Sequence, residues 1–204
     1  MGKKLLIVVD CQYDFINPNG ALYVKGAEKI EDNILKIIGD FDVVEFTKDA
    51  HPVDHCSFID NGGSWPIHCV ENTIGCGIPV SLLKTAKDYF CLSKGTDPMK
   101  EEYGAYEDED EFALTLELAV EGNIYPNDEI KTIKEWIKDI DNVVLCGVAG
   151  DICVLETLKN IVNHIGTDKV SVYLDGVASI DGGIKLNTYI KENNIKIYKY
   201  ESDN

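Results

Sequence analysis

Cys153 lies where a turn of small residues, 147–151, is expected to pass into a helix. Unpaired backbone amides and the partial positive charge at a helix start favour a thiolate, and the same amides can hold the oxyanion of an attacked carbonyl. Taken alone, a cysteine in such a place is more often a buried structural residue. A thiol nucleophile also needs a base and an orienting charge, so the rest of the chain must supply them.

Asp10 and Lys94 are the candidates for these partners. Asp10 follows the apolar run 5–9, and Lys94 follows a shorter run at 89–93. Taken alone, Asp10 can be explained as an ion-pairing carboxylate and Lys94 as a solvated lysine. In a parallel sheet, however, the residues that follow the strands gather at one edge, so Asp10, Lys94 and Cys153 are expected to converge. Asp10 would then act as the base, while Lys94 favours the thiolate and the developing oxyanion.

A second group of residues suggests a metal site. His51, His55 and His68 are three of the four histidines in the chain, and they closely follow Asp49. Asp49 and His51 are two residues apart at a strand end, so both side chains face the same way in extended backbone. With His68 they form an N/O ligand set that leaves coordination positions open and suits Zn²⁺, Fe²⁺ or Mn²⁺. The alternative is a set of surface histidines without a metal.

Aromatic residues lie close in sequence to both groups. Phe15 comes shortly after Asp10, Trp65 shortly before His68, and Tyr103 after Lys94. Any one of these aromatic residues is more often an ordinary packing residue. As a set, Phe15, Trp65 and Tyr103 could clamp a flat ring, which indicates a small aromatic substrate.

Strand and helix patterns alternate along the chain. Apolar runs predict strands at 5–9, 43–47, 89–93, 142–148, 170–175 and 196–200. Apolar residues at helical spacing predict helices at 26–40, 126–141, 151–162 and 182–193, whereas 48–88 is expected to be mostly loop. Such alternation is typical of a three-layer α/β/α fold with a mainly parallel sheet of about six strands, covered by helices on both faces.

Composition narrows the possible classes of protein. The 204 residues contain no long linker or internal repeat, so a single domain over 1–204 is expected. A net charge of −17 disfavours nucleic-acid binding, and no segment approaches the roughly 20 apolar residues of a membrane span. The N-terminal run resembles a buried strand and not a signal peptide. Seven cysteines without a CxxC pair therefore indicate a reducing cytoplasm. The acidic run at 101–111 is explained as a solvated loop.

Five segments resemble one known family. They are VVDCQYDF, KDAHPVDHCSF, SWPIHCV, SKGTD and GVAGDICVLET, which occur in the family's order. The chain from about residue 5 to 180 is similar to the nicotinamidase/pyrazinamidase branch of the isochorismatase-like cysteine hydrolases. The resemblance implies a metal-containing enzyme that converts nicotinamide to nicotinate and ammonia through a cysteine thioester. It also implies one divalent metal ion, Zn²⁺ in the first place, with Fe²⁺ and Mn²⁺ as alternatives.

The resemblance also implies a role for individual residues. Asp10, Lys94 and Cys153 match the family's catalytic triad, and Asp49, His51 and His68 match its metal ligands. The amides of Ala149 and Cys153 match the oxyanion hole, with a cis peptide before Ala149, and Phe15, Trp65 and Tyr103 match the ring-binding wall. His55 matches a position that binds metal in some members only, so its role stays open.

Some positions depart from the family pattern and bear on the substrate. Gly150 stands where members usually carry Thr, Tyr13 where they carry Asn, and Ile152 where a Tyr or His often precedes the nucleophile. An amidase of the same superfamily acting on another carboxamide, a carbamoyl or a ureido substrate is the nearest alternative. Two others are a metallohydrolase that uses a metal-bound hydroxide, with a structural Cys153, and a non-catalytic binding protein. The sequence leaves the metal's identity open, and a homo-oligomer is neither predicted nor excluded.

Overall fold

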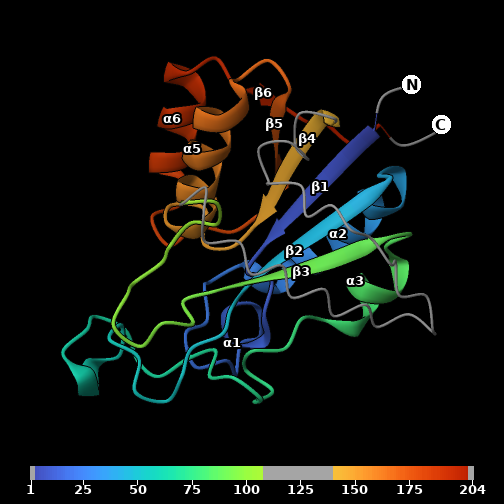
Figure 1. The fold of residues 1–204 in the computed structure, drawn as a ribbon. Helices are drawn as coiled ribbons and strands as arrows, with labels where there is room; N and C mark the ends of the chain where they lie inside the picture. The colour runs from blue at the N-terminus through green and yellow to red at the C-terminus, as the bar shows by residue number, and fades with distance from the viewer. Residues whose placement is uncertain (1–2, 108–139, 202–204) are drawn as a thin grey trace, which may run out of the picture.

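A computed structural model describes residues 3–107 and 140–201 of the chain. Six strands form one sheet in the order β3-β2-β1-β4-β5-β6, and each neighbouring pair is parallel (Figure 1). The strands are β1 (Lys3–Val9), β2 (Val43–Asp49), β3 (Tyr89–Lys94), β4 (Ile140–Gly147), β5 (Val170–Val177) and β6 (Lys196–Ile197). The predicted parallel α/β sheet is therefore confirmed.

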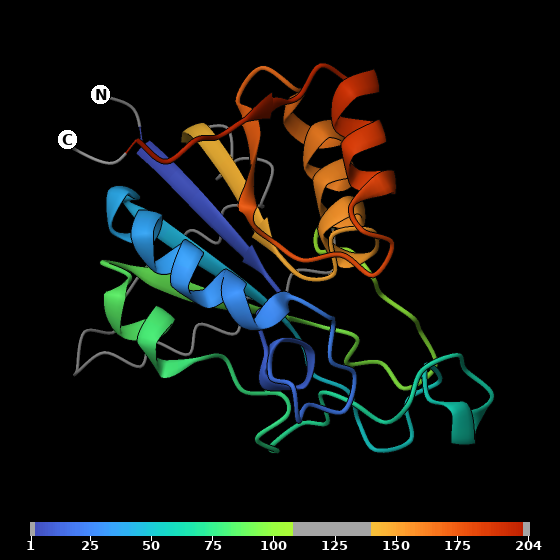
Figure 2. The same ribbon diagram turned by 180° about the vertical axis from the view of Figure 1, so that it is seen from behind.

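Helices cover both faces of this sheet. Figures 1 and 2 show α2 (Ile30–Ile37) and α3 (Val80–Thr85) on one face, with α5 (Cys153–Ile165) and α6 (Ile184–Glu192) on the other. Alternate residues of β1 enter the two cores, since side chains along a strand point to opposite faces. Leu6 packs in the core that contains Ile34 of α2, whereas Ile7 packs in the core that contains Leu158 of α5.

Most predicted elements exist, with shifted ends. The helix expected at 26–40 is α2 flanked by short 3-10 turns, Ala27–Lys29 and Ile38–Asp40. Helix α5 begins at Cys153 and not at 151, and β5 continues to Val177. The last strand is shorter than expected and ends at Ile197.

Some short elements were not predicted, and one predicted helix is wrong at its end and otherwise lies outside the described residues. The segment 48–88 contains helix α3, which begins directly after Pro79, as well as a 3-10 turn, Ile59–Asn61. A four-residue helix, α1 (Tyr13–Ile16), was also not predicted. Residues 140 and 141 open strand β4 and do not end a helix, while the rest of the helix expected at 126–141 falls outside the described ranges. The acidic run is described only as far as residue 107.

The order of the strands determines where a ligand can bind. From β1 the chain adds β2 and β3 on one side, and it then returns to add β4, β5 and β6 on the other. The reversal lies between β1 and β4, and ligands of such sheets bind outside the carboxyl ends of the strands at this point. Asp10 directly follows β1, and Cys153 follows the turn after β4.

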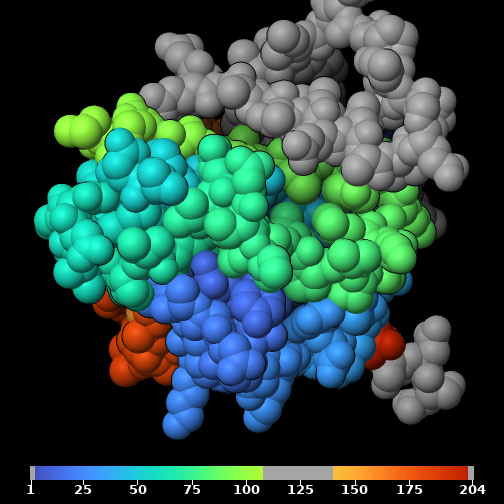
Figure 3. Space-filling view, turned by 90° about the horizontal axis from the view of Figure 1, so that it is seen from below, coloured from blue at the N-terminus to red at the C-terminus, as the bar shows by residue number. Residues whose placement is uncertain are grey.

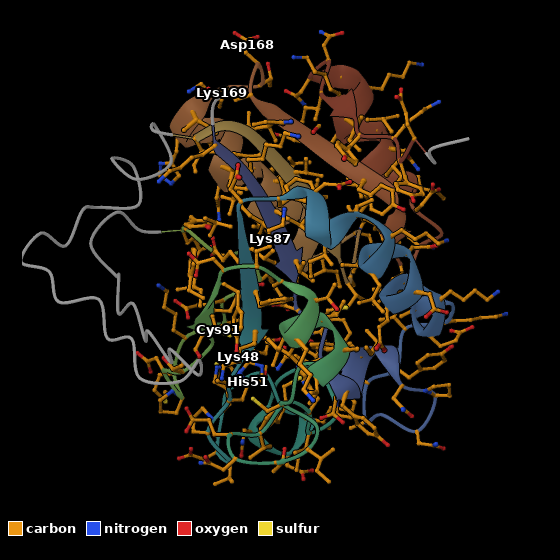
Figure 4. The ribbon with its side chains drawn as sticks, turned by 90° about the vertical axis from the view of Figure 1, so that its right-hand side faces the viewer. Lys48, His51, Lys87, Cys91, Asp168 and Lys169 are labelled. Atoms are coloured by element: carbon orange, nitrogen blue, oxygen red, sulfur yellow. The ribbon has the colours of Figure 1, made fainter. Side chains whose placement is uncertain are left out.

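The figures show which end of the sheet this is. In Figure 4, His51, just after β2, lies at the opposite end of the molecule from Lys169, just before β5. Figure 3 views the end that carries the loops, where the segment after β1 (blue) lies beside segments that follow β2 (cyan to green). Within residues 3–107 and 140–201, no helix is long and apolar enough to cross a bilayer.

Candidate active site

Asp10 and Lys94 meet at the carboxyl end of the sheet. Asp10 comes directly after β1, with a positive φ of 47°, and its side chain is fully buried. The Lys94 ammonium lies 2.8 Å from Asp10 Oδ2 and also forms an ion pair with Asp49. Asp49 and Lys94 are opposite residues of the paired strands β2 and β3, which explains why their side chains meet.

Cys153 lies beside the two carboxylates. It is the first residue of α5, and its Sγ is within 4.8 Å of a carboxylate oxygen of Asp10 and of Asp49. The residue is 8% exposed, so it is buried but borders the cavity described below. The residues predicted to converge after β1, β3 and β4 are thus brought together.

The charges in this group oppose one another. Burial raises the pKa of the Cys153 thiol well above its ordinary value, and the Lys94 ammonium only partly offsets this. Burial likewise raises the pKa of Asp10, again against the influence of Lys94. Lys94 thus acts on Cys153 in the expected direction, toward the thiolate, while burial acts against it.

The turn before α5 places two amides beside the sulfur. The Val148–Ala149 peptide is cis, as the family resemblance implies. The amides of Ile152 and Val154 both donate to the Ala149 carbonyl at 3.1 Å, which folds the turn back on itself. No hydrogen bond described for residues 147–154 uses the amide of Ala149 or Cys153 as its donor. These two amides are therefore available to a ligand, and their role as an oxyanion hole stays a prediction.

Asp49, His51 and His68 form a group that fits a metal ion. All three are buried, and one ligand atom of each lies within 4.8 Å of the others. Nδ1 of His51 lies 2.8 Å from the Gly95 carbonyl, and Nδ1 of His68 lies 2.7 Å from the Pro66 carbonyl. A ring N–H that donates to a carbonyl leaves the other nitrogen, Nε2, as a free ligand atom. This N/O set suits a divalent metal such as zinc.

His55 does not join this group. Its ring stacks on that of His51 with the centroids 4.1 Å apart. Nδ1 of His55 lies 2.7 Å from Ser57 Oγ, and Nε2 lies 3.0 Å from the Lys100 carbonyl. Both ring nitrogens are thus engaged by protein groups, so His55 supports His51 by packing and offers no free lone pair.

A cavity joins the two groups. Phe15, Trp65 and Tyr103 line it, together with His68 and Cys153. Trp65 Nε1 donates a hydrogen bond to Tyr103 Oη at 3.2 Å, so these two rings hold one another. The three aromatic residues singled out in the sequence are thus brought to one cavity.

Sequence reasoning missed several residues of this site. Four aliphatic residues and one acid complete the cavity wall, namely Leu22, Val24, Ile152, Ile180 and Glu101. Gln12 was also missed, although its side chain grips the backbone of Asp49: Oε1 accepts from the Asp49 amide at 2.8 Å, and Nε2 donates to the Asp49 carbonyl at 2.7 Å. Thr47 contacts Asp10, and one signal could have found it, since strand alternation places Thr47 on the same face as Asp49.

The chain is similar to proteins of known activity, although no protein-family model matches it. A nicotinamidase of Schizosaccharomyces pombe is 32% identical over 180 residues, which cover 74% of this chain and 73% of that protein. The structure of a pyrazinamidase of Pyrococcus horikoshii in complex with zinc has a TM-score of 0.74 at 29% identity and covers 97% of this chain and 99% of that one. The yeast nicotinamidase bound to the inhibitor nicotinaldehyde has a TM-score of 0.74 at 26% identity, with 97% and 100% covered. Together with the arrangement of the site, the identity and coverage of these matches show that the chain belongs to the nicotinamidase family.

Proposed function

We propose that this chain hydrolyses nicotinamide to nicotinate and ammonia, with Cys153 as the nucleophile and one divalent metal ion bound beside it. The observation that carries the proposal is the shared cavity. Cys153, backed by Asp10 and Lys94, borders the same cavity as Asp49 and His68. Similar proteins that act as nicotinamidases support the choice of substrate.

In the first half of the reaction, Asp10 accepts the proton of the Cys153 thiol, and the sulfur attacks the carboxamide carbon. The amides of Ala149 and Cys153 donate to the oxyanion, and each such donor is commonly worth about 3 kcal/mol. The C–N bond then breaks as Asp10 gives its proton to the departing nitrogen. Ammonia leaves, and the acyl group stays on the sulfur as a thioester.

In the second half, a water molecule takes the place of the ammonia. Asp10 accepts one of its protons, and the oxygen attacks the thioester carbon. The C–S bond breaks, the sulfur recovers its proton from Asp10, and nicotinate is released. Burial lowers the pKa of Lys94, but the negative charge of Asp10 and Asp49 more than offsets this and raises that pKa well above its ordinary value, which favours the cation. Lys94 stabilises negative charge at each stage.

Asp49, His51 and His68 would hold the metal, and zinc is the first choice for this N/O set. When bound, the metal supplies an anchor for the ring nitrogen of the substrate. Gln12 fixes the backbone of Asp49, and the Gly95 and Pro66 carbonyls fix the two imidazoles, so the chain presents a preformed set of ligand atoms. The zinc complex of the similar pyrazinamidase supports this assignment.

Phe15, Trp65 and Tyr103 would enclose the ring of the substrate. Their cavity has a largely apolar wall with a few polar groups, as is typical of small-molecule sites. Holding the ring in this way fixes the carboxamide next to Cys153, and positioning of this kind is commonly worth several kcal/mol.

The enzyme is expected to work in a reducing compartment. Cys11, Cys56, Cys69, Cys76, Cys146 and Cys153 are thiols and form no disulfides. Such a cysteine-rich chain with a nucleophilic thiol suits the cytoplasm.

Replacing the nucleophile tests the proposal. The Cys153→Ala variant should fold, bind metal and release no ammonia from nicotinamide, whereas Cys56→Ala, which changes a half-buried cysteine elsewhere, should keep full activity. Iodoacetamide should inactivate the wild type as Cys153 becomes alkylated. If Cys153→Ala retained turnover that a chelator abolished, the chemistry would belong to a metal-bound hydroxide instead.

A panel of amides tests the substrate. Nicotinamide and pyrazinamide both carry a ring nitrogen meta to the carboxamide, whereas benzamide has no ring nitrogen. We expect ammonia release from the first two and a much lower kcat/KM for benzamide. Faster hydrolysis of a carbamoyl or ureido compound than of nicotinamide would indicate a different amidase of the superfamily.

A further inference from the structure

Thr47 lies inside strand β2 and contacts Asp10 through its side chain. Both residues are fully buried. The Asp10 amide donates to the Thr47 carbonyl at 3.1 Å, which continues the pairing of β1 with β2 by one residue beyond the end of β1. The same amide approaches Thr47 Oγ1 at 3.2 Å, and the hydroxyl donates to Asp10 Oδ1 at 2.7 Å.

These contacts fix the direction of the hydroxyl. Oγ1 accepts from the Asp10 amide and donates its own hydrogen to Oδ1, so the two contacts together fix the hydroxyl. The Thr47 hydroxyl therefore holds one oxygen of the Asp10 carboxylate in place.

The second oxygen has different surroundings. Lys94 Nζ lies 2.8 Å from Asp10 Oδ2 as an ion-pair partner. Asp10 also lies beside the Cys153 thiol, since the Cys153 sulfur is within 4.8 Å of an Asp10 carboxylate oxygen.

We propose that Thr47 is a positioning residue for the hydrolysis, whose hydroxyl holds the Asp10 carboxylate in the orientation in which it takes and returns the proton of Cys153. The inference rests on the proposed function, since it concerns the same proton transfer. Without the hydroxyl, Lys94 alone holds the carboxylate, and its orientation relative to the sulfur is less well fixed.

Three variants of the metal-loaded protein test the role of Thr47. Thr47→Val removes the hydroxyl at nearly constant shape, and Thr47→Ser keeps it. Ser171→Ala is the matched control, because it removes another buried strand hydroxyl, on β5, that donates to the Val143 carbonyl. Thr47→Ala, which leaves room for a water molecule, replaces the valine variant if that one does not fold.

Thr47→Val should lower kcat for nicotinamide about 10- to 100-fold, the cost of misplacing a catalytic group. KM and the affinity for nicotinate, measured by calorimetry, should stay within about threefold of the wild type, since no binding contact changes. Thr47→Ser and Ser171→Ala should keep kcat within about threefold. An unchanged kcat in Thr47→Val would overturn the inference. The inference would also be overturned if Thr47→Ser lost as much kcat as Thr47→Val and both variants bound nicotinate more weakly. A purely structural role of Thr47 predicts that pattern.

The result can be separated from a failure of the proposed function. If the wild type released no ammonia from nicotinamide, the proposed function would be wrong, but the proton transfer from Cys153 to Asp10 could still be measured. The rate of Cys153 alkylation by iodoacetamide, followed on the Cys153 peptide by mass spectrometry, should be lower in Thr47→Val than in the wild type and Thr47→Ser. Equal rates in all three would contradict the role of Thr47.

Discussion

Asp49 and Lys94 are partners across two parallel strands, and their side chains form a buried ion pair next to Cys153. The pair joins the two halves of the site, because Asp49 also belongs to the group that fits a metal, while Lys94 also contacts Asp10. A single cation is thus shared by two buried carboxylates. Burying charges in this way is costly unless every charge keeps its partner.

Replacing Lys94 should therefore affect both stability and activity. Lys94→Met leaves Asp10 and Asp49 without their cation, and removing one partner of a buried ion pair typically costs about 3–5 kcal/mol. We expect this loss in the free energy of unfolding by urea, and no measurable ammonia release.

Lys48→Met is the control for this measurement. Lys48 precedes Asp49, but alternation along β2 turns it to the other face, where it lines a separate cleft with Cys91 (Figure 4). Its replacement should change stability by less than about 1 kcal/mol. Equal stability of the two variants would show that Lys94 is not needed to balance the buried carboxylates.

Metal binding should distinguish His68 from His55. His68→Asn removes a candidate ligand and should weaken zinc binding by at least about 100-fold, measured by competition with a chromogenic chelator. His55→Asn keeps a polar group near Ser57 and should stay within about tenfold of the wild type, since the His55 nitrogens are engaged elsewhere. An equal loss in both variants would make His55 a ligand.

The two aromatic residues that hold one another should affect KM more than kcat. Trp65→Ala removes a ring face and should raise KM for nicotinamide about tenfold, in line with about 1 kcal/mol or more for aromatic contacts. Tyr103→Phe removes only the hydrogen bond from Trp65 and should raise KM by no more than about fivefold. A fall in kcat with an unchanged KM, in steady-state assays of ammonia release, would contradict a role in ring binding.

The free energy of unfolding should depend on pH through the ionisation of Glu45. Glu45 is fully buried on β2, where Tyr106 donates a hydrogen bond to Oε2 and Oε1 has no described donor. Burial raises the pKa of Glu45 to about 8, although the bond from Tyr106 opposes the shift. Since the folded state binds this proton more tightly than the unfolded state, the contribution is complete below about pH 4.5 and is lost as pH rises toward 8.

Comparison with Glu45→Gln isolates this effect. Glutamine stays neutral, so the difference in unfolding free energy between variant and wild type should grow in favour of the variant by up to about 1.4 kcal/mol per pH unit between pH 5 and 8. Urea unfolding at several pH values measures it. A constant difference over this range would show that Glu45 is already ionised in the folded protein.

The sequence predicted those parts of the fold that repeat a pattern. Strands β1, β2 and β4 are apolar runs, and α2 and α5 have apolar residues at helical spacing, so their existence was clear and only their ends shifted. Helix α3 has six residues, which is too short for a helical period to appear, and it lies in a segment rich in turn-forming residues. Asp10, Asp49 and Lys94 could be placed at the site from the sequence alone, because each lies at the carboxyl end of a predicted strand.

The orientation of side chains in loops could not be predicted in the same way. His55 is nearer to His51 in sequence than the candidate ligand His68 is, yet its ring nitrogens contact Ser57 and the Lys100 carbonyl. Leu22, Val24 and Ile180 come from irregular segments with no periodicity that would indicate which residues border the cavity. Strand alternation places Thr47 on the same face as Asp49, but only the structure shows its contact with Asp10.

The reversal of strand order between β1 and β4 has a consequence for the assembly of the enzyme. Asp10, Asp49 and Lys94 come from the N-terminal half of the sheet, and Cys153 comes from the C-terminal half. Neither half alone carries both a nucleophile and a proton acceptor, so a truncated or half-folded chain is inert. Ammonia release thus reports that the two halves have docked, and it can serve as a functional readout of complete folding in refolding or fragment-complementation studies.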